Sequence, residues 1–164
     1  MGLIGFPNPV NEKAARTVAT GVVAMGLLFA ITGWGWVLIP LTYGFWARVL
    51  TGPKLSPLGQ LATRVIAPRL GEPTLVAGPP KRFAQGVGVV FTSAASVLFL
   101  TVGPTPARIV IGLLVVAASL EAFVGLCLGC KAFGLMMNVG LIPESICEEC
   151  ADISKRYPQL AKRP

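Results

Sequence analysis

The sequence contains no histidine among its 164 residues, and only 13% of the residues are charged. Histidine is the commonest general base and the commonest metal ligand of proteins, so its absence leaves Cys, Asp, Glu, Lys and Tyr for proton or metal chemistry. A soluble domain of this length carries roughly twice as large a charged fraction. The shortage of charge therefore argues against a soluble protein.

Apolar residues make up 54% of the chain, and the mean hydropathy is +0.72. Several apolar runs approach the ~20 residues that a helix needs to cross a bilayer, which indicates an integral membrane protein. The net charge of +7 does not indicate a nucleic-acid partner, because the basic residues flank the apolar runs. That placement is typical of topology signals and contacts with lipid headgroups, so membrane lipids are the expected partners.

The apolar runs predict an all-α membrane protein, one domain over residues 1–164 with four transmembrane helices. We place the spans at about 17–33, 34–50, 83–102 and 107–130, with Pro40 as a kink in the second. Between the second and third spans, Ser56-Pro57 begins a short helix with apolar residues at helical spacing. We interpret it as an amphipathic helix lying in the membrane interface, the alternative being an ordinary helix packed on a partner.

Lysine and arginine are distributed unevenly between the two sides of this arrangement. Only Arg108 of the 14 basic residues lies beside the turns that join spans one to two and three to four. The positive-inside rule then places both termini, the central loop and the cysteine-rich tail 143–164 in the cytoplasm. A cytoplasmic compartment keeps ordinary dithiols reduced, which weighs against a permanent disulfide.

Two opposite charges fall at membrane depth. By the 1.5 Å rise per residue, Glu121 and Arg48 each lie roughly 20 Å from the outer ends of their helices. Burying either alone is costly, so we predict that Glu121 pairs with Arg48, with Gln85 as a further partner. The pair either only locks helices two and four together, or makes Glu121 a proton acceptor or substrate ligand. Arg16 and Arg82 complete this polar cluster, whose arginines could bind an anion.

Helix phase constrains what Glu121 does. On a continuous helix, Glu121 and the nearest cysteines point in different directions. The glutamate face instead carries small residues, and Gly88, Thr92 and Ser96 form a matching stripe on the third span. We therefore predict that helices three and four form a close pair.

All four cysteines lie near the C-terminus as two CxxC pairs, Cys127 with Cys130 and Cys147 with Cys150. Four cysteines at this spacing are typical of a tetrahedral site for one zinc ion. An iron–sulfur cluster uses the same ligands, and zinc is preferred of the two. The same residues could instead act as two dithiols that exchange electrons or sulfur. Four unreacted thiols are the third interpretation.

Several phrases of the sequence resemble the bacterial membrane family known as domain of unknown function 4395. They are FPNPVNEKAAR, PPKRFAQ, ASLEA, CLGCKAFGLM and GLIPESICEEC, and they extend over almost the whole chain. The resemblance implies a four-helix protein of the bacterial inner membrane that keeps both CxxC pairs, Glu121, Arg16 and Arg82. It also implies a context of thiol and sulfur metabolism, with thioredoxin-like or rhodanese-like partner proteins. Such context is association and does not give a mechanism.

Two functions follow from these observations. The leading hypothesis is a membrane component of a cytoplasmic-side thiol-disulfide or sulfur-transfer system that acts through Cys127, Cys130, Cys147 and Cys150. The alternative is a non-enzymatic membrane subunit in which these four cysteines hold a structural zinc ion and dock a partner protein. Four short helices bury little surface, so we expect a homo-oligomer or a larger membrane complex. The sequence does not decide whether the protein is an enzyme.

Overall fold

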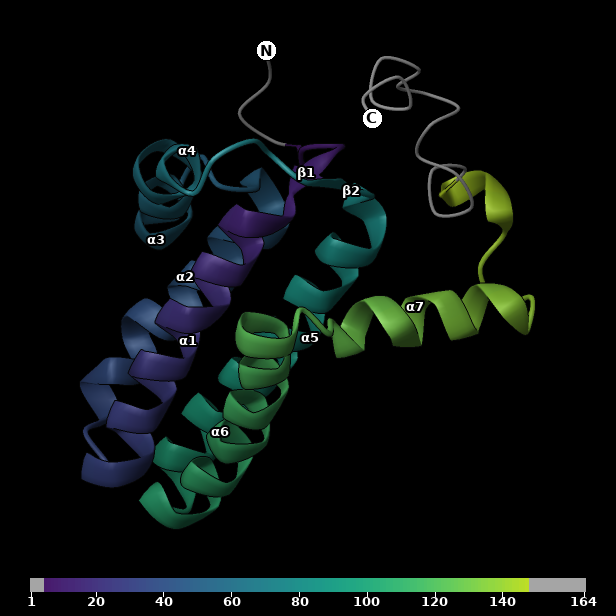
Figure 1. The fold of residues 1–164 in the computed structure, drawn as a ribbon. Helices are drawn as coiled ribbons and strands as arrows, with labels where there is room; N and C mark the ends of the chain where they lie inside the picture. The colour runs from purple at the N-terminus through teal and green to yellow at the C-terminus, as the bar shows by residue number, and fades with distance from the viewer. Residues whose placement is uncertain (1–4, 148–164) are drawn as a thin grey trace.

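The computed structural model of the chain describes residues 5–147, which form a bundle of helices with a two-stranded sheet and a short helical segment at one end (Figure 1). Helix α1 packs on α6, α2 packs on α5, and α5 also packs on α6 and α7. The helices of the bundle are α1 (Glu12–Thr32), α2 (Leu38–Thr51), α5 (Gly78–Thr101), α6 (Pro104–Ser119) and the crossing helix α7 (Leu128–Asn138). The shorter elements are η1 (Gly35–Val37), α3 (Pro57–Gln60), η2 (Leu61–Ile66), α4 (Ala67–Arg69), η3 (Leu120–Val124) and η4 (Glu144–Ile146).

Three helical segments of the described chain are long and apolar enough to cross a membrane: Glu12–Thr32, Gly78–Thr101 and Pro104–Val124. They coincide with the predicted first, third and fourth spans. The predicted second span is divided between the 3₁₀ turn η1 and the 14-residue helix α2, and it does not reach the same length. Three segments that could span are consistent with a multi-pass membrane protein.

Local sequence signals account for the helix ends. The Asn11 side chain accepts the Lys13 N–H at 3.0 Å and caps α1, with Glu12 in the first turn. Gly33, at φ 70°, ends that helix, and the next helix begins after the tryptophan turn. Pro40 lies in the first turn of α2 rather than in its middle, and in the first turn a missing N–H breaks no intrahelical hydrogen bond. The predicted mid-span kink at Pro40 is therefore wrong.

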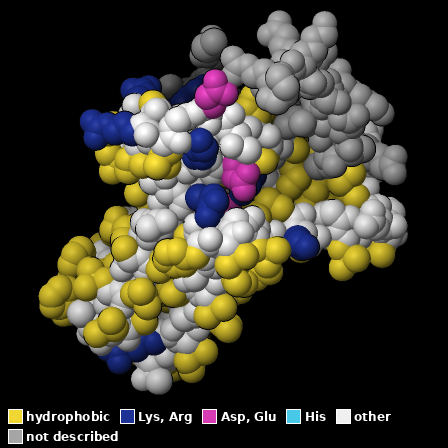
Figure 2. Space-filling view, viewed as in Figure 1, with side chains coloured by type: hydrophobic (Ala, Val, Ile, Leu, Met, Phe, Trp, Pro, Cys, Tyr) yellow, Lys and Arg dark blue, Asp and Glu magenta, His cyan; other side chains and the backbone are white. Residues whose placement is uncertain are grey.

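The core lies between α1, α2, α5 and α6 and includes Val22, Phe29, Leu41 and Ile111. The outer surface of the same helices is apolar, with Ile31, Ile39, Val90, Leu100 and Val116 between 60% and 82% exposed. In Figure 2 the yellow apolar side chains cover the lower part of the bundle, whereas most of the charged side chains gather toward its upper end. This distribution is what a lipid-facing bundle requires.

Small residues of α5 make a close contact, but with a different helix from the predicted one. A Cβ on Gly88 would lie 2.1 Å from Cε1 of the Phe45 ring, and the Thr42 hydroxyl lies 3.2 Å from that of Ser96. Phe45 and Thr42 belong to α2. Helices α5 and α6 do pack together as predicted, while the stripe of Gly88, Thr92 and Ser96 accommodates α2.

The charged end of the bundle is closed by the N-terminal segment and the central loop. Strand β1 (Val10–Asn11) pairs antiparallel with β2 (Leu75–Val76), a pairing that the sequence did not predict. The predicted short helix is present from Pro57 to Arg69, and Ser56 caps it by accepting the Gly59 N–H at 3.2 Å. Its buried Ala62 and Ala67 face the protein, while Leu61 and Val65 are exposed.

Candidate functional site

The chain leaves the bundle at Gly125, four residues after Glu121. Helix α6 continues into the π-helical segment η3, which ends at Gly125 in the left-handed region at φ 76°. The Leu126 N–H then donates to the Leu120 carbonyl at 3.0 Å, and α7 starts across the bundle axis (Figure 1). The prediction of one helix through residues 107–130 is therefore wrong, because glycine readily adopts the left-handed conformation that ends a helix.

The Arg16 side chain stabilises this helix end. Its Nε donates to the Ala122 carbonyl and its Nη2 to the Phe123 carbonyl, both at 3.1 Å. Arg82 acts in a similar way on α2, where its Nε donates to the Val49 carbonyl at 3.2 Å. A cation at the C-terminal end of a helix satisfies carbonyls that lack intrahelical partners and interacts favourably with the helix dipole.

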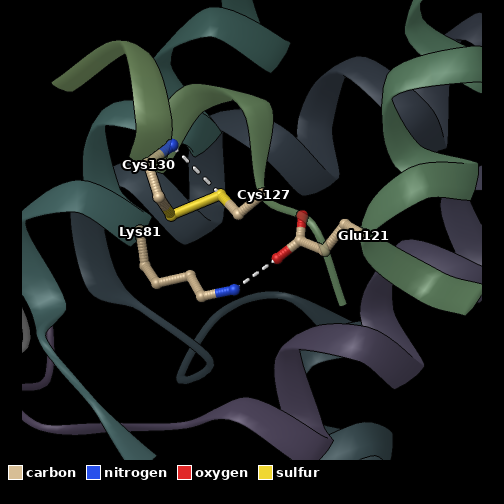
Figure 3. Close-up of a disulfide and its surroundings, with 4 residues drawn as sticks. All are labelled: Lys81, Glu121, Cys127 and Cys130. Carbon is tan, nitrogen blue, oxygen red and sulfur yellow. Dashed lines mark hydrogen bonds and ion pairs between the residues drawn. A yellow bond between two sulfur atoms is a disulfide. The ribbon is translucent and has the colours of Figure 1, made fainter. Parts of the chain in front are cut away.

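Cys127 and Cys130 lie at the beginning of α7 and form a disulfide, with their Cα atoms 5.2 Å apart (Figure 3). Cys127 is the N-cap residue, and its Sγ accepts the backbone N–H of Cys130 at 3.2 Å. Cys127 is buried at 8% exposure, whereas Cys130 is only partly buried. A dithiol at a helix N-terminus has backbone donors in place to stabilise a thiolate.

Glu121 forms an ion pair with Lys81, whose Nζ lies 2.6 Å from Oε1. The two side chains are 15% and 9% exposed, and Figure 3 shows them beside the disulfide. The predicted pairing of Glu121 with Arg48 is therefore wrong. Lys81 lies in the first turn of α5, which begins at Gly78 rather than at the predicted residue 83. Two prolines precede Lys81, and prolines in a first turn were the signal for this earlier helix start.

Arg48 is 4% exposed and uses other partners. Its Nε donates to Oε1 of Gln85 at 2.8 Å and its Nη1 to the Ser56 hydroxyl at 3.2 Å. Its guanidinium carbon lies 4.5 Å from the centre of the Phe45 ring. Gln85, predicted as a further partner of the Glu121–Arg48 pair, thus contacts Arg48, and Ser56 is a partner of Arg48 that the sequence did not predict.

A cavity of about 280 Å³ brings the cysteine site and the acidic group together. Its polar lining includes Glu121, Gln85 and Cys127, and the rest is mainly apolar, from α1, α5 and α6. The helix break at Gly125 is the reason for this juxtaposition, since a continuous helix points Glu121 and the cysteines in different directions. A carboxylate and a cysteine sulfur therefore line the same cavity.

The second CxxC pair is only partly described. Cys147 is buried at 3% exposure and is not a free thiol, while Cys150 lies outside the described residues. Within residues 5–147 no three His, Cys, Asp or Glu side chains are grouped so that they could hold a metal ion, so Cys147 does not join Cys127 and Cys130 in such a group. The four-cysteine zinc site includes Cys150 and stays a prediction.

The sequence model of the family described as Domain of unknown function (DUF4395) matches residues 10–138. The match includes Lys81, Glu121, Cys127 and Cys130, and it ends before the second CxxC pair. It confirms the resemblance that the sequence phrases indicated. No curated protein and no solved structure matches the chain.

Proposed function

The chain belongs to the DUF4395 family. From the site described above, which lies within the matched residues, we propose that the protein is a membrane component of thiol–disulfide exchange. The observation that carries the proposal is the Cys127–Cys130 disulfide at the N-terminus of α7, next to the Glu121–Lys81 ion pair. Two cysteines held close enough to form a disulfide, beside a group that can accept a proton, support exchange chemistry.

The exchange begins with the reduced pair. The thiolate of Cys130, the more exposed of the two, attacks one sulfur of a partner disulfide and releases the partner's other sulfur as a thiolate. Cys127 then attacks Cys130, which closes the intramolecular disulfide and releases the partner as a dithiol. Two electrons pass to the partner, and the two protons lost by Cys127 and Cys130 end on the partner's two sulfurs. Glu121 is placed to take the Cys127 proton during this step.

The second pair, Cys147 and Cys150, is the proposed relay to a soluble partner. Exchange between two pairs conserves electrons, because one pair is oxidised as the other is reduced. A thioredoxin-like protein, which carries a dithiol or disulfide of its own, supplies or removes the electrons at the outer pair. The same arrangement suits sulfur transfer from a rhodanese-like protein.

We place this site at the cytoplasmic face of a bacterial inner membrane, with four spans and both termini in the cytoplasm. Helix α2 is about 21 Å long by its rise, and η1 adds about 6 Å, so together they approach the ~30 Å thickness of a hydrocarbon core. The other basic residues of the described chain lie away from the turn at Arg108, which supports this orientation.

A redox titration of the purified full chain tests the proposal. The protein is equilibrated in detergent with glutathione mixtures of graded potential, without chelator, and its thiols are then trapped with a heavy maleimide. We expect a two-electron transition that Cys127→Ser and Cys130→Ser each abolish. With oxidised glutathione, Cys127→Ser should hold a mixed disulfide on Cys130, and Cys130→Ser should hold far less.

The same samples distinguish the alternative function. If Cys127 and Cys130 do not change state across the titration, and one zinc ion per chain survives purification, the exchange proposal is wrong. The protein is then a membrane subunit whose four cysteines fold a docking segment around zinc. Iron in place of zinc would indicate a cluster on the same ligands.

A further inference from the structure

A second cavity, of about 260 Å³, lies at the charged end of the bundle. Its walls come from the N-terminal segment, the first turns of α1, the end of α2, the α3–η2 helix and the first turns of α5. The polar residues of its lining are Asn11, Arg48, Thr63, Lys81 and Gln85, and none of the described residues that line it is acidic. We call it the arginine cavity.

Arg48 gives this cavity an unpaired charge. Its Nε and Nη1 have the acceptors described above, but its buried Nη2 has no hydrogen-bond partner. Among the described residues, Glu121 forms its ion pair with Lys81 and no carboxylate forms one with Arg48, so none neutralises the guanidinium directly. Two buried cations therefore share one buried carboxylate, which leaves an excess of one positive charge at the site.

The neutral groups of the lining are oriented as donors. Oε1 of Gln85 already accepts from Arg48, and Oδ1 of Asn11 already accepts the Lys13 N–H. The remaining end of each amide is therefore an NH₂ group, which can only donate. A cavity whose described lining includes a guanidinium, an ammonium and two amides that donate, and no acid, favours an anion.

We propose that the arginine cavity binds a phosphate-type oxyanion through Arg48. A guanidinium with a free Nη2 suits an oxygen of such an anion, and the bound charge balances the excess at the site. The rest of the lining is apolar and includes Phe6, Val18 and Leu75. The oxyanion is either a free inorganic ion or the phosphate of an anionic lipid whose chains lie against the apolar wall. The site uses none of the cysteines and does not depend on the exchange function.

Thermal unfolding of the full chain in a phosphate-free maltoside detergent tests the proposal. Inorganic phosphate replaces chloride at constant ionic strength in one arm, and phosphatidylglycerol is titrated into the micelles in the other. We expect a saturable rise in the unfolding midpoint, by roughly 5–10 °C at a hundred times Kd, in at least one arm. A rise with phosphate alone identifies the free ion, a rise with lipid alone identifies the headgroup, and competition between them shows one shared site.

Variants locate the site. Arg48→Gln should lose the response, whereas Arg108→Gln, at the opposite end of the bundle, should keep it. If Arg48→Gln does not fold, Thr63→Trp is the second variant. Thr63 is exposed and lines the cavity, so a larger side chain there obstructs the cavity without removing a charge. Equilibrium dialysis of radiolabelled phosphate against the unmodified chain should give one ion per chain if the free ion is the ligand. No response in either arm, or a response that Arg48→Gln and Thr63→Trp both keep, would overturn the proposal.

Discussion

At the scale of single residues, the buried charges decide how the helices meet. Lys81 and Glu121 join the first turn of α5 to the end of α6, while Arg48 joins α2 to α5 through Gln85. Arg16 and Arg82 instead bind carbonyls at helix ends. Each of these groups has a different partner, so the cluster is a set of separate contacts that together fix the charged end of the bundle.

The ion pair of Lys81 and Glu121 gives a prediction at this scale. Glu121→Gln leaves a buried ammonium without its counter-charge, so we expect the free energy of unfolding to fall by about 3 kcal/mol. For a chain of this size that lowers the unfolding midpoint by roughly 6–12 °C. Circular dichroism of the purified protein in detergent measures it.

The double variant Lys81→Met/Glu121→Leu is the control for that experiment. Replacing both partners of a buried pair by apolar residues is often neutral, so its stability should lie within about 1 kcal/mol of the unmodified protein. If the double variant instead loses as much stability as Lys81→Met and Glu121→Leu lose in sum, the ion pair is not the interaction that holds α5 and α6 together at this point.

At the scale of elements, the crossing helix α7 places the dithiol. Its second residue, Gly129, lies directly against α5, where an added Cβ would be 2.6 Å from Cβ and 2.7 Å from Cα of Ala84. Further along, the ring of Phe133 packs at 5.7 Å from that of Phe83. The close approach at Gly129 thus sets how deeply Cys127 is buried.

Gly129→Ala tests that role. The new methyl group meets the backbone of Ala84, which no change of rotamer can relieve, so we expect α7 to shift away from α5 at a cost of about 1–3 kcal/mol. Cys127 should then become more accessible, which a faster rate of maleimide labelling under reducing conditions would show.

Gly134→Ala is the matched control in the same helix. Nothing lies within 4 Å of a Cβ at Gly134, and alanine stabilises a helix by up to about 1 kcal/mol relative to glycine. This variant should keep the wild-type labelling rate and lose no stability. Equal effects of the two substitutions would mean that the contact with Ala84 does not position α7.

At the scale of the whole molecule, charge is separated from apolar surface along the bundle (Figure 2). The outer surface of α1, α2, α5 and α6 carries exposed apolar residues, and the central loop carries basic residues at one end. At the other end, Arg108 lies near the start of α6 and donates to the Ile31 carbonyl. One end of the bundle is therefore cationic and the other almost uncharged.

This asymmetry predicts the topology. In a background with all four cysteines changed to serine, Thr105→Cys lies in the exposed first turn of α6 and Thr74→Cys in the central loop. In spheroplasts that retain an intact inner membrane, a membrane-impermeant maleimide should label Thr105→Cys at once and Thr74→Cys only after lysis. The reverse pattern would place the dithiol on the outer side, and labelling of both would show that α5 does not span.

Much of the fold could be predicted from the sequence because the signals that predict it are local. Apolar length marked three spans, Asn11 and Ser56 marked helix starts, and glycine marked the turns between helices. The phrase around Cys127 and Cys130 also identified the family and the candidate site. Each of these signals acts through residues a few positions apart, so it does not depend on how the helices are arranged.

Tertiary structure decided which distant groups meet. Glu121 pairs with Lys81 and not with Arg48 because helix α5 starts earlier than the apolar run of α5. Glu121 lines the same cavity as Cys127 because the π-helical turn and Gly125 end the helix between these two residues. The small residues of α5 face α2 because that is where the Phe45 ring fits. Depth along a helix can be read from sequence, since the rise per residue is constant. The rotation, tilt and interruption of each helix depend on packing against the others, and these set the partners of every buried charge.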